Sequence, residues 1–168
     1  MIGNLKKGSD FKGICSYVLE KEGANYIDSN MMGRDVEELT SEFNALLAVG
    51  IGTEIKKRVM HISLSAAIGE NVSDKKWVII ARDYLRRVGL SVSKHQYFVA
   101  KHTDKLYSHI HIVVNRVGFD GKVHAGHWDR LKSKEVCLEL EKTYKLKQTL
   151  SKDRDRERGG LERDARMM

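Results

Sequence analysis

Residues 101–116 read KHTDKLYSHIHIVVNR, and the second half of this stretch decides the fold that we expect for the chain. His109 and His111 lie two residues apart in a run of β-branched residues, which is typical of a strand. Because side chains alternate between the two faces of a strand, both imidazoles point to one face. The apolar residues that alternate with them point to the other face, toward a core. The stretch therefore predicts a strand with two histidines on its polar face.

A third histidine, His102, lies seven residues before His109, at the end of another apolar run, 96–100. If the loop 103–108 turns the chain back, His102 comes level with the pair. Three neutral imidazoles with open coordination positions are typical of a catalytic metal site rather than a closed structural one. An H-x-H pair alone is weak evidence, and the third histidine, Asp104 and Asn115 at fixed spacing strengthen the prediction.

The composition describes a soluble, basic protein. The chain has 168 residues, a net charge of +7 and a sequence pI of about 9.4. This excess of Lys and Arg favours a polyanionic partner, although a solvated basic surface explains the charge equally well. The sequence has no apolar run long enough to span a membrane and no signal peptide, so we expect a cytoplasmic protein. Cys15 and Cys137 lie in predicted helices and are expected to be buried thiols.

Hydrophobic periodicity predicts an α+β fold. The expected helices are 11–21, 36–49, 75–88 and 131–144, and the expected strands are 25–29, 58–66, 96–102, 109–117 and a short return at 122–124. This order predicts a mainly antiparallel sheet with helices packed on it, in two or three layers. Residues 1–150 form the expected domain, and the densely charged residues 151–168 are expected to be a tail or a linker.

Two helix starts carry capping residues. Asp35 with Glu38 is typical of a capping box for the second helix, and Asp74 is the expected cap of the third.

The strand 58–66 alternates in the same way as the histidine strand. His61, Ser63 and Ser65 share one face, and apolar residues occupy the other. We expect this polar face and the imidazole face of residues 109–115 to be the same face of the sheet.

A divalent metal held by three neutral imidazoles keeps its full charge, which suits the oxygen of a phosphodiester. A basic chain with such a site suggests a nuclease. The attacking group is then either a metal-bound water or a side chain. Among the tyrosines, the residues themselves do not distinguish Tyr17, Tyr26 and Tyr107.

The segment HTDKLYSHIHIVVNRV resembles the histidine motif of plasmid conjugation relaxases, the mobilisation nucleases of the HUH endonuclease superfamily. In that motif a strand carries His-hydrophobic-His, a third histidine lies upstream beside an acidic residue, and an asparagine follows. The matching positions are His102, Asp104, His109, His111 and Asn115.

Two further stretches resemble motifs of the same family, and together the matches cover most of residues 1–150. SDFKGICSYVLEK is similar to the motif that bears the nucleophilic tyrosine, which corresponds to Tyr17. RVMHISLSA is similar to the motif whose serine contacts DNA, which corresponds to Ser65. A tyrosine that precedes the histidines favours a relaxase over a rolling-circle replication initiator, in which it follows them.

The resemblance implies a mechanism and a ligand set. Tyr17 attacks single-stranded DNA at a transfer origin, forms a 5′-phosphotyrosyl link and later rejoins the strand. His102, His109 and His111 bind Mg²⁺ or Mn²⁺, and Asp104 acts as a base or orients a ligand histidine. The residues expected to contact DNA are Ser65, His61, Asn115 and Arg116. Accessory mobilisation or coupling proteins and a bacterial cytoplasm are the expected setting.

Other interpretations remain open at this point. A replication initiator predicts a nucleophile after the histidines, such as Tyr144. A non-catalytic nucleic-acid-binding module predicts no metal and no covalent adduct. A structural metal site predicts loss of folding when metal is removed. His124 and His127 are expected to be surface or turn residues.

Overall fold

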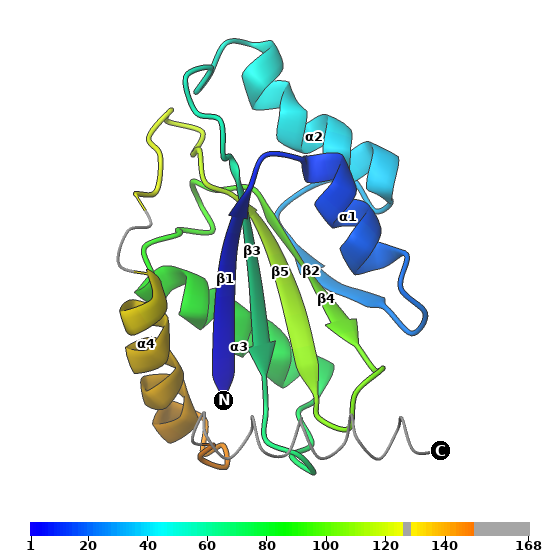
Figure 1. Ribbon diagram of the computed structural model, residues 1–168, viewed down its shortest axis with the longest axis vertical. Coiled ribbons are helices and arrows are strands. Elements are labelled where there is room, and N and C mark those ends of the chain that lie inside the picture. The colour runs from blue at the N-terminus through cyan, green and yellow to red at the C-terminus, as the bar shows by residue number, and fades with distance from the viewer. Residues whose placement is uncertain (126–128, 150–168) are drawn as a thin grey trace.

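The computed structural model describes residues 1–125 and 129–149, and their fold is α+β, as predicted (Figure 1). The elements in chain order are β1 (Ile2–Gly8), α1 (Phe11–Leu19), β2 (Asn25–Ser29), α2 (Val36–Ala48), β3 (Val59–Ser65), α3 (Asp74–Arg87), β4 (Tyr97–His102), β5 (His109–Asn115) and α4 (Asp129–Thr143). His127 and the charged tail 151–168 lie outside the described residues.

The five strands form one sheet in the order β1-β3-β5-β4-β2, and every neighbouring pair is antiparallel. The strand with the paired histidines, β5, is therefore the central one. Helices α1 and α2 lie over one face of the sheet, and α3 and α4 lie against the other (Figure 1). The fold is thus a three-layer sandwich, the larger of the two arrangements expected.

Each face of the sheet has its own hydrophobic core. Ile110, Ile112 and Val114 of β5 pack toward α3 and α4, as the alternation predicts. The imidazole face is not fully free, because Val113 and Phe98 on that face pack under α1 and α2. All seven residues of β5 are consequently buried. This second core places α1 directly beside the histidines.

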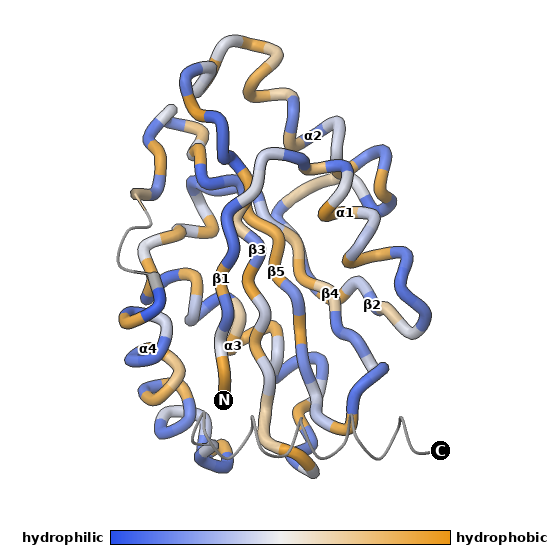
Figure 2. The backbone as a smooth tube through the Cα atoms, in the orientation of Figure 1, coloured by the Kyte–Doolittle hydropathy of each residue, from blue (hydrophilic) through white to orange (hydrophobic). Residues whose placement is uncertain are grey.

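Strand β1 was not predicted. Its sequence, IGNLKKG, has only two large apolar residues and does not alternate clearly, and it is more hydrophilic than the strands beside it (Figure 2). It pairs with β3 over its whole length and forms one edge of the sheet. Gly3 permits close packing on α4, because a Cβ there would lie 2.8 Å from the Ser133 hydroxyl.

Several local predictions differ from the structure in detail. The return 122–124 is no strand, since only Val117 and Val123 form an isolated bridge. Ser73, not Asp74, caps α3, and its hydroxyl accepts from the Lys76 amide at 3.2 Å. Asp35 caps α2 as expected, accepting from the Glu38 amide at 2.8 Å. Both cysteines are buried thiols that are not joined in a disulfide, as predicted.

Candidate metal centre and nucleophile

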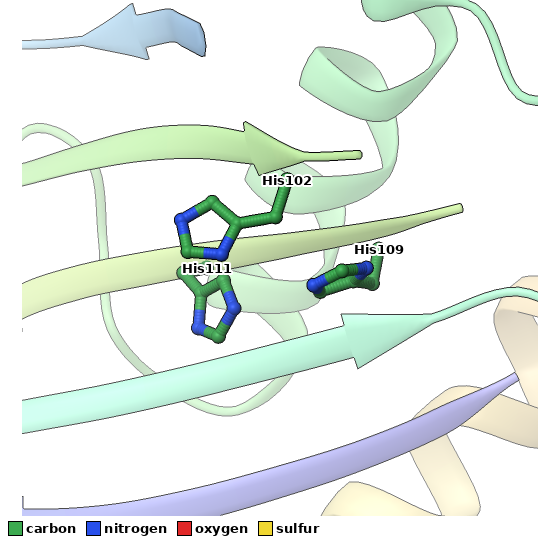
Figure 3. Close-up of side chains that lie close together, drawn as sticks. All are labelled: His102, His109 and His111. Carbon is green, nitrogen blue, oxygen red and sulfur yellow. The ribbon is translucent and has the colours of Figure 1, made fainter. Parts of the chain in front are cut away.

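The register of β4 and β5 brings the three histidines together. His102 lies directly opposite His109 in the antiparallel pair, and His111 follows two residues along the same face. The three side chains converge at this end of the two strands (Figure 3). One ring nitrogen from each lies within 4.8 Å of the others, and all three side chains are buried. The predicted triad is therefore present as a geometric unit.

Each ring has one nitrogen engaged by the protein. His102 Nε2 donates to the Val18 carbonyl at 2.7 Å, and His109 Nδ1 lies 3.4 Å from the Tyr107 carbonyl. His111 Nδ1 lies 2.8 Å from His61 Nε2. These contacts fix the ring orientations, as outer contacts of metal-binding histidines do.

The remaining nitrogens fit a metal ion. His102 Nδ1 is buried and has no hydrogen-bond partner within the described parts of the chain. A buried polar atom without a partner costs free energy, so this lone pair is better explained by a ligand. Three imidazole nitrogen ligands match the donor set of a catalytic metal site that keeps coordination positions open.

Burial favours the neutral form of His61, His109 and His111. Desolvation, together with the neighbouring histidines, lowers the pKa of His111 to about 3. Desolvation likewise lowers the pKa of His61 to about 4, and it also lowers the pKa of His109. Neutral imidazole is the form that binds a metal. At neutral pH no proton therefore competes for the ligand nitrogens of His109 and His111.

Tyr17 lies over the face of the sheet that carries the three histidines. Helix α1 buries Phe11, Cys15 and Val18 against the sheet, and this leaves Tyr17 56% exposed. Its ring meets His61 and His111 edge-on, with centroids 6.1 and 6.2 Å apart. An exposed phenol at the edge of the triad has the placement that a nucleophile needs.

The other candidate tyrosines are placed differently. Tyr26 stacks on Phe98, and its hydroxyl donates to the Gly33 carbonyl. Tyr107 lies against His109 but is buried. The Tyr144 hydroxyl donates to Asp83 on α3, on the opposite side of the sheet. The structure thus gives no support to a nucleophile after the histidines.

Asp104 links the triad to the end of α1. Its carboxylate lies 2.7 Å from Lys21 Nζ and 3.4 Å from His109 Nε2. Burial would raise its pKa, but the hydrogen bond from Lys21 and the charge of that ammonium outweigh this, and the pKa lies below its usual value. Asp104 is therefore a charged neighbour of the triad. Lys21, which follows Tyr17 by four residues, was not predicted.

The polar face of β3 continues the imidazole face, as expected. Ser65 lies opposite His109, Ser63 lies opposite His111, and His61 lies opposite Val113. Directly opposed residues of an antiparallel pair share a face. His61 and Ser65 therefore border the triad.

Asn115 and Arg116 are not brought to the site. They lie at the other end of β5, where Asn115 is fully buried and bonded to Gln96 and to the Val117 amide. The buried Arg116 guanidinium donates to the carbonyls of Lys57, His124 and Ala125. Both side chains hold neighbouring loops in place through these hydrogen bonds. We therefore no longer expect them to contact DNA. His124 is also buried, with Nε2 donating to the Val88 carbonyl, so its assignment to the surface was wrong.

An antiparallel sheet that carries three clustered histidines beside an exposed tyrosine defines a candidate metal-dependent nuclease. The family model described as "Relaxase: MobA/VirD2-like, nuclease domain" matches residues 17–146, and this chain belongs to that family of plasmid mobilisation relaxases. The match includes Tyr17 and the whole triad. No curated protein matches the chain. Within residues 1–125 and 129–149, no helix has both the length and the apolar character needed to cross a membrane.

Proposed function

We propose that this chain nicks one strand of DNA at a plasmid transfer origin, with Tyr17 as the nucleophile. The observation that carries the proposal is the exposed Tyr17 ring at the edge of a buried three-histidine cluster. The phenolic oxygen of Tyr17 forms a bond to the scissile phosphorus, and the bond from phosphorus to the 3′-oxygen breaks. The phenol releases its proton, and the departing oxygen takes one up to become a 3′-hydroxyl. The reverse transfer rejoins the strand.

His102, His109 and His111 are the residues that would hold Mg²⁺ or Mn²⁺. When bound, such an ion supplies a Lewis acid for the phosphate oxygens. Asp104 is already charged, so it is poorly suited to take up a proton. It lies 3.4 Å from His109 Nε2, the nitrogen that the Tyr107 carbonyl leaves for the metal, and would add negative charge beside a bound ion.

Two contacts join the segment that carries Tyr17 to the histidine cluster. The Val18 carbonyl, one residue after Tyr17, accepts from His102. Lys21 reaches Asp104, which lies against His109. The Lys21 ammonium also lies 6.0 Å from the centre of the Tyr17 ring. These contacts position the phenol before DNA arrives, which lowers the entropic part of the barrier.

The DNA is proposed to cross the part of this face that α1 and α2 leave uncovered. Ser65 and His61 border the triad there, and Asn4 and Lys6 of β1 are exposed on the same face. The net charge of +7 favours a polyanion. Transfer-origin DNA in a bacterial cytoplasm, delivered with accessory mobilisation proteins, is the setting that this reaction requires.

The test is incubation of labelled single-stranded origin DNA with the protein and Mn²⁺, followed by a denaturing gel. Wild type should give a protein–DNA adduct and a free 3′-hydroxyl that a polymerase can extend. Tyr17→Phe and a chelator should each abolish the adduct. An adduct that persists in Tyr17→Phe would assign the nucleophile elsewhere.

A further inference from the structure

His61, on the neighbouring strand β3, makes a side-chain contact to the triad. Its Nε2 lies 2.8 Å from His111 Nδ1, and the two rings stack with centroids 5.0 Å apart and planes 20° apart. The contact runs diagonally from β3 to β5, since His61 pairs with Val113 and His111 pairs with Ser63.

This contact determines which nitrogen of His111 is available. A hydrogen bond between two imidazole nitrogens needs a proton on one and a lone pair on the other. While His111 Nδ1 is held by His61, only His111 Nε2 can bind a metal, and a metal needs the lone pair there. The single proton of neutral His111 then resides on Nδ1 and is donated to His61 Nε2.

We propose that His61 is a positioning residue, which holds His111 in the tautomer and orientation that present Nε2 to the metal. This inference rests on the proposed function, because it assigns the partner that orients one ligand of the proposed metal site. It replaces the expectation from the sequence that His61 serves as a DNA contact. Carboxylates and carbonyls are the usual partners of ligand histidines, and loss of such a partner costs 10- to 100-fold in metal affinity.

The geometry also explains why an imidazole suits this position. The Tyr17 ring packs edge-on against both His61 and His111. The two stacked imidazole rings therefore form one surface on which the phenol ring packs. Lys6, on the opposite position of β1, shares this face with His61. A carboxylate at residue 61 would pair with that lysine and would add a negative charge close to the DNA phosphates.

The experiment measures Mn²⁺ binding to DNA-free protein by titration calorimetry in wild type, His61→Gln and His61→Leu. Glutamine keeps an acceptor oxygen at about the reach of Nε2, whereas leucine keeps bulk and removes the acceptor. We expect His61→Leu to bind about 10- to 100-fold more weakly, and His61→Gln to remain within about threefold of wild type. Ser63→Ala, which alters the same strand directly opposite His111, is the matched control and should not change the affinity.

A second readout is the tautomer of His111, which ¹⁵N spectra of the metal-free protein report directly. Wild type and His61→Gln should carry the proton on Nδ1, and His61→Leu should populate both tautomers. If His61→Leu fails to fold, as judged by thermal melting, His61→Asn replaces it, because its shorter side chain cannot reach.

Equal affinities in wild type and the leucine or asparagine variant would overturn the inference, as would equal losses in these variants and in His61→Gln. If wild type itself binds no Mn²⁺, the proposed metal site fails together with the inference. If wild type binds Mn²⁺ and only the adduct is missing, the nicking proposal fails and the role of His61 stands.

Discussion

The neutral histidines of the metal centre should make the metal-free protein sensitive to mild acid. Burial lowers the pKa of His111 from 6.5 to about 3 and that of His61 to about 4. Below pH 6.5 the unfolded chain therefore binds protons at these two residues that the folded protein does not bind. Protons then favour the unfolded state, so stability falls as the pH drops from 6.5 toward 4.

The size of the effect follows from the two shifts. At pH 5 an unfolded imidazole is almost fully protonated, 1.5 pH units below its ordinary pKa, and each residue thus costs about 2 kcal/mol between pH 7 and pH 5. The pair costs about 4 kcal/mol, a large part of the roughly 5–15 kcal/mol that stabilises a domain. His109 and His95, whose pKa values burial also lowers, act in the same direction. The carboxylates with lowered pKa values contribute only below about pH 4.

Urea unfolding followed by circular dichroism measures this directly in metal-free protein at pH 7 and pH 5. His61→Gln removes one titrating group, and its loss of stability should be smaller than that of wild type by about 2 kcal/mol. Saturating Mn²⁺ should stabilise the folded state at pH 7. The reasoning is refuted if wild type is equally stable at both pH values, or if His61→Gln loses as much stability as wild type.

Three further outcomes are expected. Asp104→Asn should lower the cleavage rate by about 10- to 100-fold. It should change stability by less than about 1 kcal/mol, because the ion pair with Lys21 is partly exposed. An unchanged rate on the adduct gel would exclude a role for the Asp104 charge beside the metal. His109→Ala should abolish adduct formation with an unchanged circular dichroism spectrum, and cleavage at the wild-type rate would show that the metal assignment is wrong. The logarithm of the DNA affinity, measured by fluorescence anisotropy, should fall steeply and linearly with the logarithm of the salt concentration. A flat response would contradict a DNA-binding face that depends on basic side chains such as Lys6.

The parts of the fold that sequence predicts best are those in which periodicity is strong. The alternation of His109 and His111 with isoleucines predicts both the strand and its two faces, and the structure confirms both. Strand β1 escapes prediction because its partner, β3, supplies the pairing that its own sequence does not specify. Tertiary context of this kind overrides weak local preference.

The site was predictable in type but not in all of its contacts. Spacing placed His102 level with His109, and the register confirms it. Asn115 was grouped with the histidines because the family's histidine motif includes an asparagine at this position, although Asn115 lies at the far end of β5 and is buried. The contact between His61 and His111 depends on the register of two strands separated by about fifty residues, which no local pattern contains.

The central claim is that Tyr17 forms the covalent bond to DNA, and peptide mapping tests it most directly. The adduct is digested with nuclease and then with trypsin, which releases residues 13–21, GICSYVLEK, with Tyr17 as its single tyrosine. We expect this peptide alone to gain the mass of a nucleotide phosphate, and fragmentation to place the mass on Tyr17. The same mass on a peptide that contains Tyr26 or Tyr107 would show that Tyr17 is not the nucleophile.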